Sequence, residues 1–421
     1  MIIKPVKKLC GTVTVPGDKS ISHRAVMFAS IAQGITHISG FLCGEDCLST
    51  VSCFRKMGVR IDVDGTDVTI YGNGINGLKP PKETLDVGNS GTTARIMCGL
   101  LSAQPFDCVI DGDSSIRKRP MKRVTEPLSL MGADIKTTDG CCPLNVKDST
   151  LTGKNITINV ASAQLKSAIL MAGLYAEGKT SVTEPTLSRN HTELMLKAFG
   201  ADITTEGTTV TVSKANSLTA KDINVPSDIS SAAFFMVAAT IIPDSHITIK
   251  NVGINPTRTG IVDALKLMGA DITYENYNDD VEPTADIVVR YAPLHSAEIG
   301  GDIIPRLIDE IPILAVAALF ADGKTVIKDA HELRVKETDR IAVIAEEFAK
   351  CGAHVECTDD GMTIQGHQTL HAAVFDSHGD HRIAMSCGVL ALALDADSEI
   401  TNAEAAAVSY PDFFNDLETL K

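Results

Sequence analysis

A short block recurs along this chain and constrains its fold more than any other feature. Blocks similar to LMGADI contain the glycines at positions 58, 132, 200, 269 and 352, which lie 74, 68, 69 and 83 residues apart. A helical pattern precedes each glycine, and two short alternating runs follow it. Glycine suits the position after a helix because it adopts positive φ freely. Each block therefore predicts an amphipathic helix followed by a β-hairpin.

A second series of predicted helices alternates with the first and is rich in Ala, Ile, Leu and Met. Most of these helices are followed by a small-residue turn and a β-branched strand, as at residues 178–182 (GKTSV). The repeating unit is thus strand, buried helix, strand, amphipathic helix and hairpin, which predicts an α/β fold with six repeats. The six buried helices are predicted to start near Ser20, Ser90, Ala163, Ser227, Asp309 and Asp380.

The repeats also predict the domain boundaries. Five hairpins follow the helices of six units, and the N-terminus supplies a further hairpin at residues 2–6 and 11–15, which we expect to complete the sixth unit. This predicts one domain at residues 18–225 and a discontinuous second domain at residues 1–17 and 226–421, with the two crossings forming a hinge. A solenoid or propeller fits less well, because propeller blades contain no helices and solenoid repeats are usually shorter.

The composition limits the kinds of partner and the location. A net charge of −15 argues against nucleic acid or an anionic membrane as the main partner, so any anion site must be local. The longest apolar runs, such as residues 313–321, are about half as long as a membrane helix needs, and the N-terminus lacks the apolar region of a signal peptide. The eleven cysteines include no CxxC pair, which favours reduced thiols and no metal. We expect a cytoplasmic protein.

Residues 16–24 (PGDKSISHR) carry the densest chemistry in the chain, where an extended segment gives way to a helix. The N-terminus of a helix has unpaired N–H groups and a partial positive charge. Lys19, Ser20 and Arg24 add cationic and hydrogen-bonding groups there. The two cations could also be ordinary surface charges beside a cap, but the recurrence of this arrangement favours an anion site.

Other predicted helix starts carry similar groups. Residues 89–93 (NSGTT) include Gly91, which allows close approach of the backbone, and residues 162–166 (SAQLK), 309–310 (DE) and 379–382 (GDHR) begin three more helices. Each of these sequences alone could be a helix cap. Together they predict several helix N-termini that converge on anionic ligands.

Three loops contain further candidates. Residues 117–123 (RKRPMKR) place five cations in seven positions, and we expect at least one of them to bind a ligand. Arg189 is a second candidate, whereas Asn190 and Glu193 are expected to cap the helix that follows.

The third loop, residues 333–340 (LRVKETDR), contains a carboxylate among cations. Glu337 and Arg340 are three residues apart and share a face if the helix has begun, whereas Lys336 would face elsewhere. Neighbouring cations favour the ionised form of Glu337 and of Asp309, which suits either carboxylate to act as a base. A structural salt bridge is the alternative for both. His378 and His381 could suggest a metal site, but no third ligand is evident and we expect them to order the backbone.

These motifs resemble, in their order and over the whole chain, the family of 3-phosphoshikimate 1-carboxyvinyltransferases (EPSP synthases). The resemblance implies two inside-out α/β domains, each with three βαβαββ repeats. It implies transfer of the enolpyruvyl group of phosphoenolpyruvate to the 5-hydroxyl of shikimate 3-phosphate with release of phosphate, in the shikimate pathway of aromatic amino acid biosynthesis, by addition and elimination and without a cofactor. The motifs that carry it are residues 16–24, 88–93, 119–121, 162–164, 308–310, 334–340 and 379–385.

The resemblance also assigns residues to each substrate. Asp309 would act as base for the hydroxyl group, Glu337 would move the proton at carbon, and Lys19 would contact the leaving phosphate. The residues that would bind shikimate 3-phosphate are Lys19, Ser20, Arg24, Ser162, Ala163, Gln164, Arg189, Asp309 and Lys336. Those that would bind phosphoenolpyruvate are Lys19, Gly91, Arg119, Gln164, Arg340 and Arg382.

Two alternatives stay open. The related transferase that uses UDP-N-acetylglucosamine carries Lys-Asn where this chain has Lys19-Ser20, and it uses a loop cysteine as an acid, whereas this chain has Arg119 and no cysteine within residues 110–120. A non-catalytic sugar-phosphate sensor would bind one anion and would not need both Asp309 and Glu337. One departure from the family is Val408, because some members carry a lysine there that contacts phosphoenolpyruvate. We expect a monomer with small-molecule substrates as its only partners.

Overall fold

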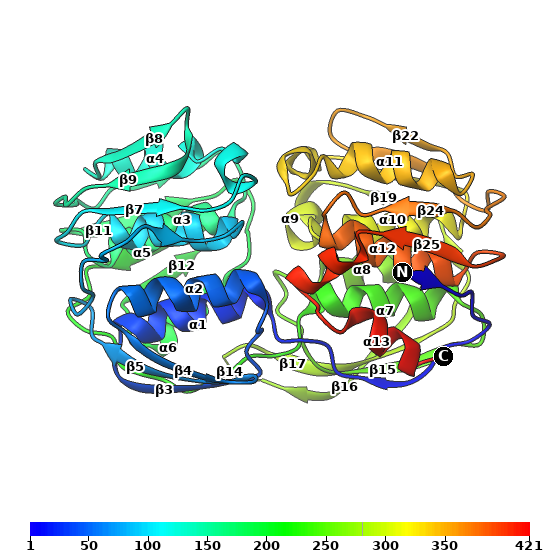
Figure 1. Ribbon diagram of the computed structural model, residues 1–421, viewed down its shortest axis with the longest axis horizontal. Coiled ribbons are helices and arrows are strands. Elements are labelled where there is room, and N and C mark those ends of the chain that lie inside the picture. Colours follow the sequence, from blue (N-terminus) through cyan, green and yellow to red (C-terminus); the bar gives the residue numbers. More distant parts are fainter. Residues whose placement is uncertain (280) are drawn as a thin grey trace. The chain divides into compact units, whose positions relative to one another are not determined.

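The chain forms two compact units in the computed structural model, which describes residues 1–279 and 281–421 (Figure 1). The N-terminal unit comprises Gly17–Val225, and the C-terminal unit comprises Met1–Pro16 with Pro226–Lys421. The domain division that we propose from the sequence differs from these units only in the place of Gly17. Each unit has its own continuous core of buried hydrophobic side chains. No helix in the described ranges is long and apolar enough to cross a membrane.

The N-terminal unit contains six α-helices among its described elements, in an order that repeats. Its helices are α1 (Lys19–Ile31), α2 (Glu45–Lys56), α3 (Gly91–Leu101), α4 (Lys122–Leu130), α5 (Ala163–Gly173) and α6 (His191–Ala198). Its strands are β3 (Gln33–Ser39), β4 (Arg60–Asp64), β5 (Asp67–Asn73), β6 (Leu85–Asp86), β7 (Cys108–Asp111), β8 (Ile135–Thr138), β9 (Cys141–Val146), β10 (Asn155–Thr157), β11 (Lys179–Thr183), β12 (Ile203–Glu206), β13 (Thr209–Ser213) and β14 (Ile223–Asn224).

The C-terminal unit repeats this order with short additions. Its helices are α7 (Ile229–Ile241), α8 (Gly260–Leu267), α9 (Ile304–Leu307), α10 (Ile311–Leu319), α11 (Arg340–Lys350), α12 (His381–Leu392) and α13 (Phe413–Thr419). Its strands are β1 (Ile2–Ile3), β2 (Cys10–Val13), β15 (His246–Gly253), β16 (Asp271–Asn278), β17 (Thr284–Arg290), β18 (Leu294–His295), β19 (Glu298–Ile299), β20 (Ala321–Asp322), β21 (Lys324–Ile327), β22 (Val355–Cys357), β23 (Met362–Gln365), β24 (Val374–Asp376) and β25 (Ser398–Thr401).

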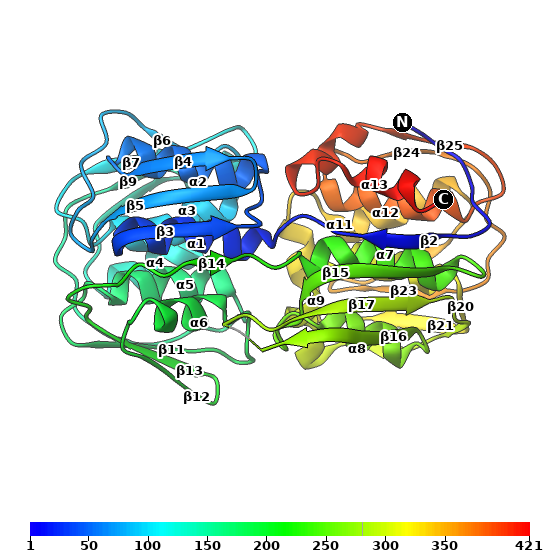
Figure 2. The ribbon, with the colours of Figure 1, turned by 90° about the horizontal axis from the view of Figure 1, so that it is seen from below.

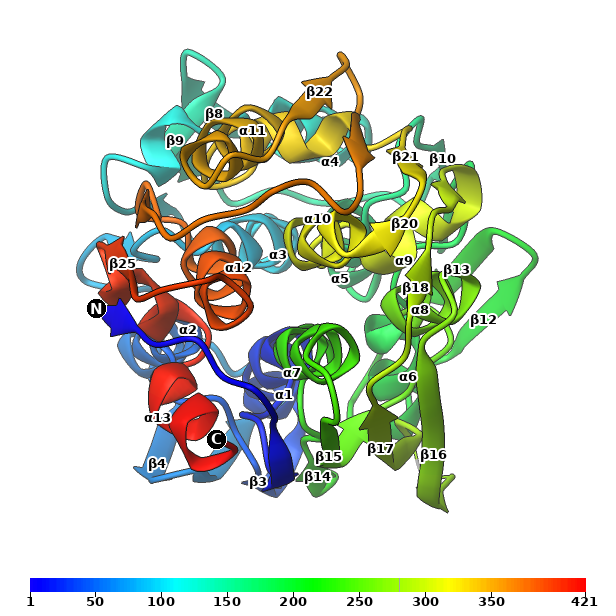
Figure 3. The same cartoon turned by 90° about the vertical axis from the view of Figure 1, so that its right-hand side faces the viewer.

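Apolar helices fill the interior of each unit, which confirms the inside-out α/β fold. Every residue of α7, α10 and α12 is buried, and in the N-terminal unit α1, α3 and α5 are almost as completely buried. A helix that is apolar on all sides is stable only when it is surrounded. In Figure 3, α7, α10 and α12 lie together inside the C-terminal unit, with sheets and the helices α8, α11 and α13 around them. All six helices begin within two residues of their predicted starts.

The sheets follow the repeats. Five four-stranded sheets each combine one parallel pair with two antiparallel pairs, as in β6-β7-β9-β8. In each of them, one antiparallel pair of consecutive strands, such as β8 and β9, forms the predicted hairpin. The sheet of the sixth repeat, β1-β25-β24, has three strands, and β18 and β20 form a separate parallel pair. The five repeat glycines lie just after their helices with φ between 84° and 107°, as predicted from the need for a left-handed residue there.

The predicted N-terminal hairpin is wrong, because β1 and β2 belong to different sheets. β1 pairs with β25 and so joins the sixth sheet, but β2 runs parallel to β15, as Figure 2 shows. Between β1 and β2 the backbone makes hydrogen bonds from Val6 N to Leu392 O and from Cys10 N to Leu420 O. The segment therefore runs from one sheet to the other and does not turn back on β1. β14 likewise lies beside β3 in the N-terminal unit. β2 thus precedes α1 of the N-terminal unit but belongs to the C-terminal unit, and β14 precedes α7 of the C-terminal unit but belongs to the N-terminal unit.

Candidate functional site

The first group of predicted site residues lies at the N-terminal ends of α1, α3 and α5. Asp18 caps α1 by accepting a hydrogen bond from Ile21 N, Ser90 caps α3, and Ser162 caps α5. Lys19, Gly91 and Ala163 are the first residues of these helices. The N–H groups and the positive dipole ends of three helices are therefore available to anions in this unit.

A buried chain of side chains connects the helices α1, α2 and α3. His23 Nδ1 lies 2.7 Å from Thr50 Oγ1, which lies 2.8 Å from Thr93 Oγ1, and Thr93 donates to Ser90 Oγ at 2.7 Å. Burial lowers the pKa of His23 to about 3, with Asp46 opposing this shift and Lys19 and Arg24 adding to it. The imidazole is therefore neutral at pH 7, and α1, α2 and α3 are joined without an added charge.

Lys19 is accompanied by a carboxylate that the sequence analysis missed. Lys19 Nζ donates to Asp46 Oδ2 at 3.1 Å, and both side chains are mostly buried. Asp46 lies in the first turn of α2, in a segment with no motif to single it out. The ion pair positions the Lys19 ammonium group at the start of α1.

Arg24 connects three segments of the N-terminal unit. Its Nε donates to Thr192 Oγ1 at 2.7 Å, its Nη2 to Ser167 Oγ at 2.8 Å, and its Nη1 to Ser20 O at 2.9 Å. Arg24 thereby ties α1 to α5 and α6. Its predicted contact with shikimate 3-phosphate stays a prediction beside this structural role.

Gly91, Arg119 and Gln164 come together at the start of α3, and Arg95 joins them. A Cβ atom on Gly91 would lie 3.0 Å from Arg95 Nη1 and 3.3 Å from Arg119 Cζ, so both guanidinium groups lie close to this backbone. Arg95 Nη1 donates to Gln164 Oε1 at 2.6 Å. The sequence analysis missed Arg95, which looks like an ordinary helix residue in the sequence.

The other cations of the loop at residues 117–123 do not all share this environment. Arg117 forms an exposed bidentate pair with Asp111, at 3.0 and 2.6 Å, and hydrogen bonding with Asp111 raises the pKa of Arg117. Arg119 instead donates to Asn89 O at 3.2 Å, next to Gly91. The loop therefore contributes Arg119 to the group at α3, whereas Arg117 makes a solvated salt bridge.

The predicted cap of α6 is wrong. Asn190 occupies the N-cap position but makes no side-chain cap bond, and the Glu193 carboxylate lies 2.8 Å from Lys166 Nζ. The buried ammonium group of Lys166 is a stronger partner for this carboxylate than a backbone amide.

In the C-terminal unit, the predicted carboxylates converge on one buried arginine. The Arg340 side chain is only 1% exposed, and its Nη2 donates to Glu337 Oε2 at 2.8 Å while Nη1 lies 3.6 Å from Asp309 Oδ1. Arg340 also bonds Asp380 through Nε at 2.8 Å and Nη2 at 3.1 Å. Burial alone would lower the pKa of Arg340, but Asp380, Glu337 and Asp309 together raise it above its ordinary value.

Lys336 contacts the same group, contrary to the expectation that it faces elsewhere. Its Nζ lies 3.3 Å from Asp309 Oδ1. The helical spacing argument fails because α11 begins only at Arg340, so residues 336–339 are not helical. Asp309 thus has two cations beside one of its oxygens.

Arg382 is held at the start of α12, which Asp380 caps. Its side chain is buried, Nη1 donates to Ser230 O at 3.2 Å, and the guanidinium carbon lies 5.9 Å from the centre of the Phe234 ring. Ser230 Oγ in turn donates to Glu310 and accepts from Arg258 Nη2. Neither Ser230 nor Arg258 belongs to a motif that the sequence reveals.

His378 is tied to α11 by a buried carboxylate. His378 Nε2 lies 2.7 Å from Glu347 Oε1, and Glu347 Oε2 accepts from Asp376 N. Glu346, Glu347 and His378 are close enough to hold a metal ion, but both Glu347 oxygens accept bonds from Lys350 Nζ at 2.8 Å. These contacts favour an ordered turn before α12.

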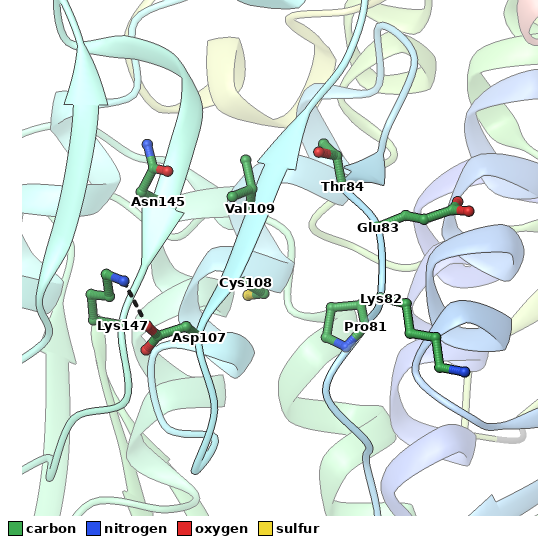
Figure 4. Close-up of a pocket in the computed structure, with 9 residues that line it drawn as sticks. All are labelled: Pro81, Lys82, Glu83, Thr84, Asp107, Cys108, Val109, Asn145 and Lys147. Carbon is green, nitrogen blue, oxygen red and sulfur yellow. Dashed lines mark hydrogen bonds and ion pairs between the residues drawn. The ribbon is translucent and has the colours of Figure 1, made fainter.

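A surface pocket in the N-terminal unit lies away from these groups. It is lined by residues of the loop at 81–84 and by residues in or next to β7 and β9, and Lys147 pairs with Asp107 on the side formed by these two strands (Figure 4). These lining residues lie at the amino ends of the parallel strands β6 and β7, whereas α3 follows the carboxyl end of β6. None of the predicted site residues lines this pocket.

Comparisons with known proteins agree with the motifs. The family model for EPSP synthase (3-phosphoshikimate 1-carboxyvinyltransferase) matches residues 3–417. A 3-phosphoshikimate 1-carboxyvinyltransferase of Bacillus cytotoxicus is 55% identical over 421 residues, with 99% of each chain covered, and one of Bacillus thuringiensis subsp. konkukian is 55% identical over 422 residues, with 99% of this chain and 98% of that chain covered.

Solved structures extend this likeness. An EPSP synthase from Acinetobacter baumannii has a TM-score of 0.89 and 46% identity, covering 100% of this chain and 97% of that chain. The enolpyruvyl transferase NikO from Streptomyces tendae has a TM-score of 0.80 at 19% identity, covering 100% of this chain and 96% of that one, and shares the fold. By its matched length and its identity to these relatives, the chain belongs to the EPSP synthase family.

Proposed function

We propose that this chain transfers the enolpyruvyl group of phosphoenolpyruvate to the 5-hydroxyl of shikimate 3-phosphate, with release of phosphate. One observation carries the proposal beyond family membership. Asp309 and Glu337 come from different segments and both contact the buried guanidinium group of Arg340. Two carboxylates around one cation suit a reaction with two proton transfers, whereas a sensor would need only groups that bind an anion.

The proposed binding residues divide between the two anionic substrates. Helix N-termini and buried arginines favour phosphate and carboxylate groups. For shikimate 3-phosphate we propose Lys19, Ser20, Arg24, Ser162, Ala163, Gln164, Arg189, Asp309 and Lys336. For phosphoenolpyruvate we propose Lys19, Gly91, Arg119, Gln164, Arg340 and Arg382, and the position of Arg95 beside Gln164 and Gly91 supports its addition to this set.

The proposed chemistry proceeds by addition and then elimination. Asp309, which lies 3.3 Å from Lys336 Nζ and 3.6 Å from Arg340 Nη1, accepts the proton of the 5-hydroxyl as the hydroxyl oxygen bonds to C2 of phosphoenolpyruvate. Glu337, starting as the carboxylic acid, delivers a proton to the methylene carbon, which becomes a methyl group. The bond from C2 to the phosphate oxygen then breaks, and Glu337 takes a proton back from the methyl group. The departing phosphate, stabilised by Lys19, takes up the proton held by Asp309, so that both carboxyl groups return to their starting states.

The test is phosphate release from phosphoenolpyruvate by the full chain, with shikimate 3-phosphate and UDP-N-acetylglucosamine as parallel acceptors. We expect release only with shikimate 3-phosphate. Release only with UDP-N-acetylglucosamine would assign the chain to the related transferase, and silence with both acceptors would favour the sensor.

A variant pair tests the assignment of the base. Asp309→Ala should abolish turnover while shikimate 3-phosphate binding, measured by calorimetry, stays detectable. Asp271→Ala is the control, because the Asp271 carboxylate is about half exposed and lies 3.8 Å from the half-exposed Arg290. Wild-type turnover by Asp309→Ala would refute the assignment.

We also propose that the protein acts as a monomer in the cytoplasm.

A further inference from the structure

A cluster of three charged side chains is buried in the N-terminal unit beneath the starts of α5 and α6. The side chains of Lys166 and Glu184 are fully buried and that of Glu193 is 7% exposed, and Lys166 Nζ lies 2.8 Å from a carboxylate oxygen of each glutamate. Removing charges from water is costly, and well-packed apolar side chains often stabilise a core equally well. The stability of the core therefore does not by itself explain this cluster.

Glu184 connects two segments that carry predicted ligands. Its Oε1 accepts from Ser162 N at 3.2 Å, and its Oε2 accepts from Ser188 N at 3.2 Å. Ser162 caps α5 directly before Ala163, and Ser188 directly precedes Arg189. One carboxylate, on the residue that follows β11, therefore sets the separation of these two segments.

Lys166 completes the connection from inside α5. Besides the two glutamates, its ammonium group donates to Ser188 O at 3.4 Å, so three directions of the group are occupied. Ser188 is thus bonded on its N–H by Glu184 and on its carbonyl by Lys166. The backbone just before Arg189 is fixed at two successive polar groups.

We infer that Lys166 and Glu184 are positioning residues that set the spacing of Ser162 and Arg189 for the acceptor substrate. The inference rests on the proposed function, which gives both segments to shikimate 3-phosphate. The residues proposed for phosphoenolpyruvate alone in this unit, Gly91 and Arg119, lie together at the start of α3 and outside the cluster. Gln164, which is proposed for both substrates, is also held from α3, by Arg95 and by Thr92 Oγ1 at 3.0 Å. The cluster should therefore govern the affinity for the acceptor more than the affinity for phosphoenolpyruvate.

The chain offers a matched pair of variants. Glu184→Gln keeps the size of the side chain but places an amide donor against one of the two N–H groups, whereas Glu193→Gln removes a charge from the same cluster without touching either segment. We expect Glu184→Gln to raise KM for shikimate 3-phosphate by about tenfold to hundredfold. The reason is that a backbone N–H group loses its hydrogen bond to a charged acceptor and is left unpaired. KM for phosphoenolpyruvate and kcat should stay within about threefold, and Glu193→Gln should stay within about threefold in all three quantities. Lys166→Met should follow Glu184→Gln.

Hydrogen exchange gives a readout that does not depend on activity. In the ligand-free protein, the amides of residues 160–164 and 186–190 should exchange faster in Glu184→Gln than in wild type or Glu193→Gln. Equal rises of both KM values, equal behaviour of the two glutamine variants, or unchanged exchange in Glu184→Gln would each overturn the inference. If wild type releases no phosphate with shikimate 3-phosphate, the proposed function is wrong, and the role of the cluster towards this acceptor is wrong with it. If wild type turns over normally but Glu184→Gln has an unchanged KM for shikimate 3-phosphate, only the positioning role is refuted.

Discussion

Replacing Asp380 by asparagine should destabilise the C-terminal unit strongly, because it removes the main counter-charge of Arg340. The two side chains are 0% and 1% exposed and are joined by two hydrogen bonds, and Asp380 also caps α12 through Arg382 N at 2.8 Å. Asparagine keeps one acceptor oxygen for the cap but leaves the guanidinium charge undercompensated in the core.

The expected loss follows from the cost of an unpaired buried charge. Breaking such a pair costs about 3–5 kcal/mol of the free energy of unfolding. For a unit of about 200 residues, each kcal/mol corresponds to about 2–4 °C in the midpoint, so the transition of this unit should fall by about 6–20 °C. Differential scanning calorimetry can follow the transition, and KM for phosphoenolpyruvate should rise in parallel because Arg340 loses the carboxylate that anchors its guanidinium group.

Two comparisons make this reasoning testable. Asp62→Asn removes the partner of Arg60, a pair with the same 2.8 Å separation but side chains 66% and 52% exposed, and should leave the transition unchanged. Asp380→Asn combined with Arg340→Met should recover much of the lost stability, since an apolar replacement removes the buried charge, yet should be inactive because a proposed phosphoenolpyruvate ligand is lost. A transition within about 2 °C of wild type in Asp380→Asn alone would refute the argument.

Three further predictions concern other parts of the two units. Because the pKa of His23 is about 3 in the folded protein and about 6.5 in an unfolded chain, its contribution to stability is present above pH 6.5 and is lost as pH falls towards 3. The free energy of unfolding of wild type should therefore fall by about 2 kcal/mol between pH 7 and pH 5, a loss that His23→Asn should not show. Urea unfolding measures both proteins, and His246→Asn is the control because His246 is exposed. Parallel pH profiles of wild type and His23→Asn would contradict this prediction. Gly91→Ala places a methyl group 3.0 Å from Arg95 Nη1 and should raise KM for phosphoenolpyruvate about tenfold with little change for the acceptor, and equal changes in both KM values would count against the assignment. Glu337→Gln removes the proton carrier and should lower kcat about 10²–10⁴-fold in the phosphate-release assay, whereas a loss below about fivefold would show that Glu337 only balances the charge of Arg340.

Local signals explain how much of the fold the sequence predicts. The glycines at 58, 132, 200, 269 and 352 mark helix ends because the left-handed conformation is a property of one residue and its neighbours. The apolar helices are recognisable for a similar reason, since a segment such as residues 311–319 (IPILAVAAL) has no polar face to expose. Most of the proposed ligands also stand at helix starts, where short motifs reveal them.

Tertiary structure decided what depends on distant partners. β2 lies beside β15 and not beside β1, because the strand before each first buried helix enters the other unit's sheet, and no local pattern distinguishes a hairpin from such an exchange. Asp46, Arg95 and Glu184 gained their roles in the same way. Each belongs to an unremarkable local sequence, and each has a partner 22 or more residues away, which is Lys19 for Asp46, Gln164 for Arg95 and Ser162 for Glu184. Only the packing of several elements brings these groups together.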